Sequence, residues 1–296
     1  TYPSYDNNRL TNVMDSEYYG SLQKDLSSPF INRATQENLA PGSTFKPLVA
    51  IAGLEEGVIS VNESIYGKGQ FTDITPSPTC WIFNQYGGHH GNETVSTAIR
   101  DSCNYFFYEV GYRLSGGRTS DYSTDKGLSI LEQYARMFGL GEHSGLEIAE
   151  YEPQISDTDP VRSAIGQGTN SYSLSHLARY VAALANRGAV YNLTLLDRLE
   201  NTDGTLLQKF EPEVYNQVEV ADSTWNAVQS GMRMVAENTS SLSKLSELGL
   251  NVAGKTGTAQ QSKSHPNHAL FIGYAPYEEP EIAVAVRIAN GYTSAN

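Results

Sequence analysis

The chain has 296 residues, of which 39% are hydrophobic and 18% charged, and its formal net charge is −13. This composition excludes a disordered chain and is typical of a globular protein with a substantial core. The negative charge argues against a nucleic-acid-binding function, because a polyanion would be repelled.

The first two thirds of the chain predict mostly helices. The longest uncharged apolar run, Leu48 to Leu54, is far shorter than the ~20 residues that cross a membrane. Its apolar residues surround the helix rather than forming a stripe, which predicts a helix buried on all sides that ends at Gly57. Residues 96–114 predict helix at both ends with a break near Ser102.

Three further capped, amphipathic helices are predicted from apolar spacing of three and four. They cover residues 128–141, ending at Gly139, residues 173–188, with Ser173 as N-cap and Gly188 as stop, and residues 222–237. Segments 60–95 and 115–127 are rich in Gly, Ser and Pro and are expected to be loops.

Strands are predicted in the last part of the chain. Residues 189–210 are interpreted as a strand pair that turns at Asp203-Gly204. Residues 251–260, 267–276 and 281–290 predict three more strands, the last two forming an antiparallel hairpin because their connection is short. Consecutive antiparallel strands together with helices indicate an α+β fold.

The pattern Ser-x-x-Lys places a hydroxyl and an amine on one helix face, which suits a serine nucleophile with a lysine base. Alone the pattern is weak, since it occurs at Ser21, Ser43, Ser123 and Ser241. Only Ser43 follows a Pro-Gly turn and begins a buried helix, where free N–H groups favour developing negative charge. An ordinary N-cap is the structural alternative for Ser43, and the other matches are expected to be surface coincidences.

Two further motifs occur later in the chain. Ser-x-Asn is found at Ser60, Ser102 and Ser294, and only Ser102 lies at a predicted helix break, where it could also be a cap. Lys255-Thr256-Gly257 occurs once, at the start of a predicted strand. The cation of Lys255 and the hydroxyl of Thr256 suit the binding of a carboxylate, and Gly257 would let a ligand lie against the strand backbone. The structural alternative is a strand interrupted by a bulge.

The three motifs occur along the chain in the order Ser-x-x-Lys, Ser-x-Asn, Lys-Thr-Gly. With motifs in this order, the chain resembles the class B penicillin-binding proteins, which are serine D,D-transpeptidases that crosslink peptidoglycan. The similarity covers YPSYDNN, PGSTFKP, GGHHG, DSCNYFFY, AIGQG and GKTGTAQ, between residues 2 and 260. SCNYFFY and GKTGTAQ are most similar to the elongation-type branch. The resemblance implies an antiparallel sheet flanked by helices with an all-helical subdomain, as in penicillin-binding transpeptidases and serine β-lactamases.

The resemblance also implies roles for individual residues. Ser43 would attack the penultimate D-Ala carbonyl of a stem peptide ending in D-Ala-D-Ala and form an acyl-enzyme, which the amine of a neighbouring stem resolves. Lys46 would be the base, Ser102 would relay the proton to the leaving amine, and Asn104 would position the substrate amide. β-Lactam antibiotics would acylate the same serine.

Lys255, Thr256 and Thr258 would hold the terminal carboxylate, and the backbone N–H groups of Ser43 and Thr258 would form an oxyanion hole. A free lysine, with a pKa of ~10.4, is a poor base, so burial and the cation of Lys255 are expected to lower the pKa of Lys46. The segment Gly166-Gln167-Gly168 is expected to be structural.

By the same resemblance, residues 1–296 are expected to be a single transpeptidase domain. The membrane anchor, a pedestal domain and both domain ends would then lie outside this chain. The resemblance implies a position on the outer face of the bacterial cell membrane and a membrane-bound glycosyltransferase partner. The chemistry would require no cofactor.

Other functions share these motifs. A serine β-lactamase needs a base for the deacylating water, often in a Glu-x-x-x-Asn loop, and no convincing equivalent lies between Ser102 and Lys255, although GLEIAEYEP is acidic. A non-enzymatic β-lactam sensor would be acylated without transferring the acyl group. A structural domain with coincidental motifs is a third alternative. A Ser-His-Asp hydrolase is disfavoured because no Gly-x-Ser-x-Gly elbow occurs.

Both cysteines, Cys80 and Cys103, bracket His89 and His90. Three states stay open: a structural zinc held by these residues, a disulfide, or two buried free thiols. Adjacent histidines on an extended loop point apart, so one is expected to bind, with Asp101 or water completing the tetrahedron. If Ser102 and Asn104 face a cleft, Cys103 should point into the protein.

Overall fold

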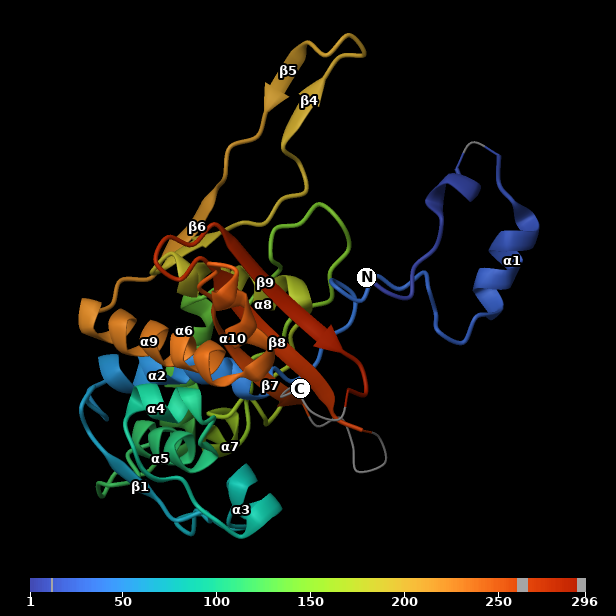
Figure 1. Cartoon of the computed structure of the whole chain (residues 1–296). Coiled ribbons are helices and arrows are strands. Elements are labelled where there is room, and N and C mark those ends of the chain that lie inside the picture. The colour runs from blue at the N-terminus through green and yellow to red at the C-terminus, as the bar shows by residue number, and fades with distance from the viewer. Residues whose placement is uncertain (12, 260–265, 292–296) are drawn as a thin grey trace.

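A three-stranded antiparallel sheet near the end of the chain frames the fold, and helices gather against one of its faces (Figure 1). The computed structural model describes residues 1–11, 13–259 and 266–291. Within these residues the strands are β1 Ile65–Gly67, β2 Gly91–Glu93, β3 Ala189–Tyr191, β4 Arg198–Glu200, β5 Leu206–Lys209, β6 Val214–Gln217, β7 Ala253–Ala259, β8 His268–Ala275 and β9 Ile282–Ile288.

The helical elements occupy most of the chain before this sheet. They are η1 Asn7–Arg9, α1 Ser16–Lys24, η2 Gly42–Phe45, α2 Lys46–Glu55, α3 Trp81–Tyr86, α4 Val95–Arg100, α5 Asn104–Leu114, α6 Thr124–Met137, α7 Pro160–Ser163, α8 Leu174–Ala185, α9 Asp222–Asn238 and α10 Ser240–Glu247. No helix of the described residues has the length and apolarity of a membrane span.

The α2 helix lies at the centre of the core, as the sequence predicts. Its residues from Lys46 to Gly53 are all buried, and it packs against α5, α6 and α9. It ends near Gly57, which has the positive φ of a helix stop (64°). Because this helix is enclosed on every side, the residues at its N-terminus are held rigidly.

The β7–β8–β9 sheet confirms the α+β prediction, including the hairpin of its last two strands. The register pairs Lys255 with Ile272, and Ile272 with Ala285, on the face that packs against the helices. Along β9 the exposed positions alternate with partly buried ones, so the sheet is covered on one face there. Gln260, at the end of the predicted strand 251–260, lies outside the described residues.

The predicted strand pair that turns at Asp203-Gly204 is confirmed as β4 and β5, but it is shorter than residues 189–210, because β3 pairs elsewhere. The β3 strand pairs with β6, from Ala189 opposite Gln217, while β4 pairs with β5 around the turn at Gly204. Figure 1 shows β4 and β5 as a hairpin that projects from the body. The β4–β5 hairpin is thus inserted between β3 and β6, which pair although they are farther apart in the sequence. Local turn signals do not reveal such a pairing.

Other boundaries differ in smaller ways. Segment 60–95, expected to be loop, contains β1, α3 and β2, and α6 begins at Thr124 with the Ser123 side chain as its N-cap. The Ser173 cap of α8 is confirmed, whereas α9 follows Ala221, which provides no side-chain cap.

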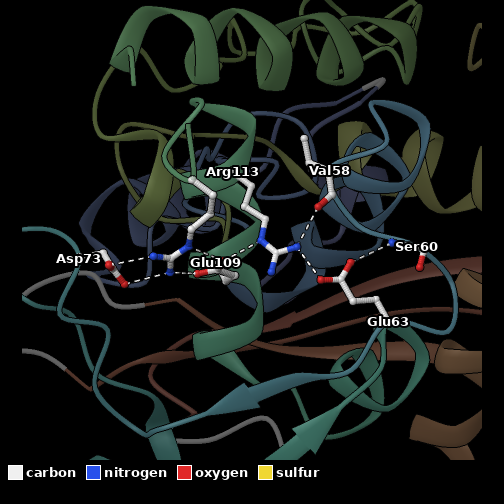
Figure 2. Close-up of polar contacts among 7 residues, drawn as sticks. Val58, Ser60, Glu63, Asp73, Glu109 and Arg113 are labelled. Atoms are coloured by element: carbon white, nitrogen blue, oxygen red, sulfur yellow. Dashed lines mark hydrogen bonds and ion pairs between the residues drawn. The ribbon is translucent and has the colours of Figure 1, made fainter. Parts of the chain in front are cut away.

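A buried carboxylate holds the C-terminal half of α5 to the loop that leads toward α3. Glu109 is 3% exposed and accepts hydrogen bonds from Arg113 Nε (2.6 Å) and Arg118 Nε (2.8 Å). Arg113 also donates to Glu63 at 2.6 Å (Figure 2). The Arg118 guanidinium donates to both carboxylate oxygens of Asp73 at 3.0 Å. Burial alone would raise the pKa of Glu109, but the bonds from Arg118 and Arg113 lower it.

We therefore expect Glu109→Ala to lower the free energy of unfolding by about 2 kcal/mol, because it leaves two arginines without their shared buried partner. The control is Glu132→Ala, which removes the exposed pair with Arg136 (2.8 Å) and should cost about 0.5 kcal/mol or less. Urea denaturation of both variants measures the difference. Equal losses would show that the Glu109 network adds nothing beyond a surface ion pair.

Candidate active site

Ser43 lies in the η2 turn, directly before α2, and is partly exposed. The turn packs closely on β7, since a Cβ on Gly42 would lie 2.4 Å from the Thr258 carbonyl oxygen, and one on Gly257 2.8 Å from Thr44 Cγ2. Gly257 is therefore needed for contact with the turn that carries Ser43, a role that the sequence did not suggest. Neither η2 nor α2 has a side-chain cap, so Ser43 is not an ordinary N-cap.

The predicted structural role of Gly166 is visible on the other side of this turn. The Gly42 N–H donates to the Gly166 carbonyl at 3.1 Å. A Cβ on Gly166 would lie 2.0 Å from the Gly42 carbonyl oxygen, and its φ of 74° suits glycine. Gly166 and β7 thus enclose the backbone of the Ser43 turn from two sides.

Lys46 begins α2 one turn after Ser43 and is fully buried. Its Nζ donates to the Ser102 carbonyl at 2.8 Å, to Ser102 Oγ at 3.1 Å and to Asn104 Oδ1 at 2.6 Å. These bonds bring the first two sequence motifs together. Burial lowers the pKa of Lys46 to about 8, against the smaller opposing effect of Cys80 and Cys103.

Ser102 and Asn104 come from the predicted break between α4 and α5. Ser102 has a φ of 52°, an uncommon conformation for a residue with a side chain. Asn104 is the first residue of α5, and Cys103 between them is 1% exposed. The prediction that Cys103 points into the protein is confirmed.

Lys255 is also fully buried, and its Nζ donates to the Thr256 carbonyl at 3.0 Å. The pKa of Lys255 lies well below that of a free lysine, mainly because the amine is buried and secondly because Lys46 carries a positive charge nearby. The expectation that Lys255 lowers the pKa of Lys46 is not supported, because burial accounts for the shift of Lys46. The repulsion between the two amines contributes to the low pKa of Lys255.

A cleft of about 920 Å³ lies above these two amines. Ser43, Ser102, Asn104, Thr256, Gly257 and Thr258 all line it. The remaining lining residues are Thr79, Trp81, Asn84, Gln85, Arg100, Asp101, Tyr108, Arg162, Ile165, Gln167, Gly168, Val235, Asn238, Thr239 and Asn267. The other Ser-x-x-Lys serines and Ser60 do not line it, and Ser294 lies outside the described residues.

Behind the cleft, three of the four predicted metal-binding residues meet. Single donor atoms of Cys80, His90 and Cys103 all lie within 4.8 Å of one another, and Cys80 Sγ is 3.6 Å from His90 Nδ1. His89 is not part of this group, because its ring turns the other way and meets the Tyr66 hydroxyl at 3.3 Å. No disulfide joins Cys80 and Cys103.

The surroundings of this group favour a thiolate. A hydrogen bond from Cys103 is the largest influence that lowers the pKa of Cys80, and His90 and the backbone add to it. The Asn104 backbone N–H donates to Cys80 Sγ at 3.3 Å, which connects the group directly to the start of α5.

Glu93 was missed by the sequence analysis. It is 2% exposed, and its Oε2, like Nε2 of His90, has no hydrogen-bond partner among the residues that the structure describes. Burial, with a smaller contribution from the nearby Asp101 carboxylate, raises the pKa of Glu93 to about 7. Asp101 itself is engaged by the Arg100 guanidinium at 2.7 and 2.8 Å. A buried carboxylate at the end of a three-residue strand leaves no recognisable sequence signal.

Comparisons with known proteins agree with this geometry. The sequence profile of the penicillin binding protein transpeptidase domain matches residues 1–296. The peptidoglycan D,D-transpeptidase MrdA of Haemophilus influenzae is 30% identical over 321 residues, which cover 97% of this chain and 47% of that protein. The chain thus spans about half the length of the curated relatives it matches.

Solved structures show the same fold. The imipenem acyl-enzyme of penicillin-binding protein A from M. tuberculosis superposes with a TM-score of 0.82 at 25% identity, covering 98% of this chain and 64% of that one. A peptidoglycan synthase complex that couples polymerization to crosslinking contains a chain with a TM-score of 0.80 and 26% identity, covering 100% of this chain and 50% of that one.

The class B, elongation-type resemblance that the motifs carry is confirmed by these matches. The chain belongs to the penicillin-binding protein transpeptidase domain family.

Proposed function

We propose that residues 1–296 form one transpeptidase domain that crosslinks peptidoglycan stem peptides through an acyl-enzyme on Ser43. The observation that carries this proposal is the buried Lys46 amine, which lies one turn from Ser43 and bonds both Ser102 and Asn104. These are the groups that acyl transfer needs: a nucleophile, a base, a proton relay and an amide that orients the substrate.

In the proposed reaction the neutral Lys46 amine takes the Ser43 proton as Oγ attacks the carbonyl of the penultimate D-Ala. The Ser102 hydroxyl, 3.1 Å from Lys46 Nζ, passes a proton to the leaving D-Ala amine. The amine of a second stem peptide then attacks the ester carbonyl and releases Ser43. β-Lactams would acylate Ser43 in the same way and block this second step.

The third motif would bind the substrate carboxylate. Thr256 and Thr258 line the cleft beside Ser43, and the buried Lys255 amine precedes them on the same strand. The Thr258 backbone is packed against Gly42, next to Ser43, which supports an oxyanion hole formed by the N–H groups of Ser43 and Thr258.

We further propose that the domain acts on the outer face of a bacterial cell membrane, in a protein that helps determine cell shape. A peptidoglycan glycosyltransferase bound in the membrane would be its partner. The similar chain in a peptidoglycan synthase complex supports this pairing.

The alternatives make different kinetic predictions. A β-lactamase would release hydrolysed penicillin within seconds, whereas a transpeptidase keeps the acyl group. A sensor would be acylated by penicillin but would not transfer the acyl group of a D-Ala-D-Ala-type thioester to an amine acceptor. Transfer without rapid β-lactam hydrolysis is the result expected for this chain.

A structural zinc behind the cleft is a separate proposal. Two thiolates and an imidazole suit Zn²⁺, and the spacing of Cys80, His90 and Cys103 is compatible with a tetrahedral ion. Glu93 or Asp101 would offer a fourth ligand. The ion would take no part in the chemistry and would brace the loop that aims Ser102 and Asn104.

Ser43→Ala should abolish covalent labelling by a fluorescent penicillin, because it removes the attacking oxygen. Ser21→Ala is the matched control, since Ser21 belongs to an exposed Ser-x-x-Lys pattern on α1 and should label normally. Labelling is quantified on denaturing gels. Full labelling of the Ser43 variant would refute the proposed nucleophile.

The acylation rate should rise with pH through a midpoint near 8 and level off above it, because Lys46 must lose its proton to act as a base. Lys46→Arg should lose nearly all activity over the whole range, since a guanidinium stays charged. Stopped-flow acylation between pH 6 and about 10 measures the profile. A rate independent of pH, or a midpoint near that of free lysine, would contradict this role.

The zinc proposal predicts about one zinc ion per chain by elemental analysis. His90→Ala should lose the metal, lower the melting temperature by about 5 °C or more and slow acylation. The adjacent His89→Ala should retain all three properties, because His89 faces Tyr66. Two free thiols without metal in the purified protein, or unchanged melting after chelation, would end the proposal.

A further inference from the structure

Two aromatic side chains, Trp81 and Tyr108, line the cleft on the side formed by α3 and α5, and Tyr108 is nearly buried (4% exposed). Trp81 is the first residue of α3, it is 38% exposed, and it lines the same cleft as Ser43 and Ser102. The other apolar lining residues, Ile165 and Val235, are aliphatic and smaller. The indole is therefore the largest apolar side chain that the cleft offers to a ligand.

The indole is fixed by its neighbours. Its Nε1–H donates to the Asp101 carbonyl at 3.1 Å, and its ring contacts His90 edge-on, with centroids 5.4 Å apart. The preceding residue, Cys80, is 1% exposed and donates its N–H to the Gly69 carbonyl at 2.7 Å. A ring held in this way loses little conformational entropy when a ligand covers it.

The polar groups beside the ring are largely engaged with one another. The Thr79 hydroxyl donates to Asn84 Oδ1 at 2.7 Å, and the Tyr108 hydroxyl donates to the Thr79 carbonyl at 3.3 Å. Covering the indole with hydrocarbon would therefore remove apolar surface from water without stripping these groups of their partners.

We propose that Trp81 is a specificity-determining residue that receives a hydrocarbon group on the acyl side of the ligand. In a stem peptide this group is the aliphatic chain of the residue before D-Ala-D-Ala, and in a β-lactam it is an apolar acyl side chain. The proposal rests on the proposed acylation of Ser43. The Nε1 bond to Asp101, the residue before Ser102, places this ring beside the catalytic loop.

Two penicillins that differ only in the acyl group test this role. Benzylpenicillin carries a phenylacetyl group, and 6-aminopenicillanic acid carries none. Trp81→Ala should lower the second-order acylation rate with benzylpenicillin about ten-fold and that with 6-aminopenicillanic acid less than about two-fold. Trp81→Phe keeps a ring but loses the Nε1 bond, and should retain most of the selectivity.

Tyr86→Ala is the matched control, because Tyr86 is a more exposed aromatic residue of α3 (76%) that does not line the cleft. It should leave both rates unchanged. Equal losses with both penicillins, or a Phe variant as impaired as the Ala variant, would show that Trp81 only positions the Asp101–Ser102 backbone. No loss with either penicillin would also overturn the proposal.

Fluorescence supplies a readout that does not depend on rates. The only other tryptophan, Trp225, is 3% exposed in the core, so Trp225→Phe leaves Trp81 as the single reporter. Acylation by benzylpenicillin should change its emission, and acylation by 6-aminopenicillanic acid should change it much less. Equal changes would contradict contact with the acyl group. A wild-type chain that neither penicillin acylates would instead refute the proposed function itself.

Discussion

The buried Lys46 amine is the interaction on which the arrangement of the cleft depends. An ammonium has three protons to donate, and here three oxygens accept them, all from Ser102 and Asn104. None of these acceptors is a carboxylate, so the positive charge is solvated without being neutralised. Such a site tolerates the charged amine but stabilises it less than water does, which is why its pKa falls.

The same bonds determine the shape of the chain around them. For both the carbonyl and the hydroxyl of Ser102 to reach Lys46, the helix must break between α4 and α5, and Ser102 takes a positive φ that costs on the order of 1 kcal/mol. Cys103 then points inward, where it meets Cys80 and His90. The thiol group and the catalytic loop are therefore two sides of one backbone turn.

Much of the site could be predicted because its signals are local. Ser43 and Lys46 lie three residues apart on one turn, and Ser102 and Asn104 lie on either side of an inward-pointing residue, so spacing alone indicates which side chains face together. The order of the three motifs indicated the family, and the short connection between the last two strands predicted their hairpin. The spacing within each motif and the length of this connection are properties of neighbouring residues.

The remaining features depend on contacts between distant segments. The α3 helix is short and without periodicity, and it forms where Cys80 is buried, so Trp81 gave no signal as a cleft residue. The choice between His89 and His90 depends on which way one extended segment turns. The β3–β6 pairing joins residues on either side of a hairpin, and the burial of Glu93 depends on the β1–β2 ladder.

The most direct test of this account is an NMR titration of the protein labelled with ¹³C at lysine Cε, with the Lys46 signal assigned by its absence in Lys46→Arg. This amine should titrate near pH 8. A Lys46 amine that titrates near the ~10.4 of a free lysine would contradict the account, because it would show that the amine is neither buried nor available as a base near neutral pH.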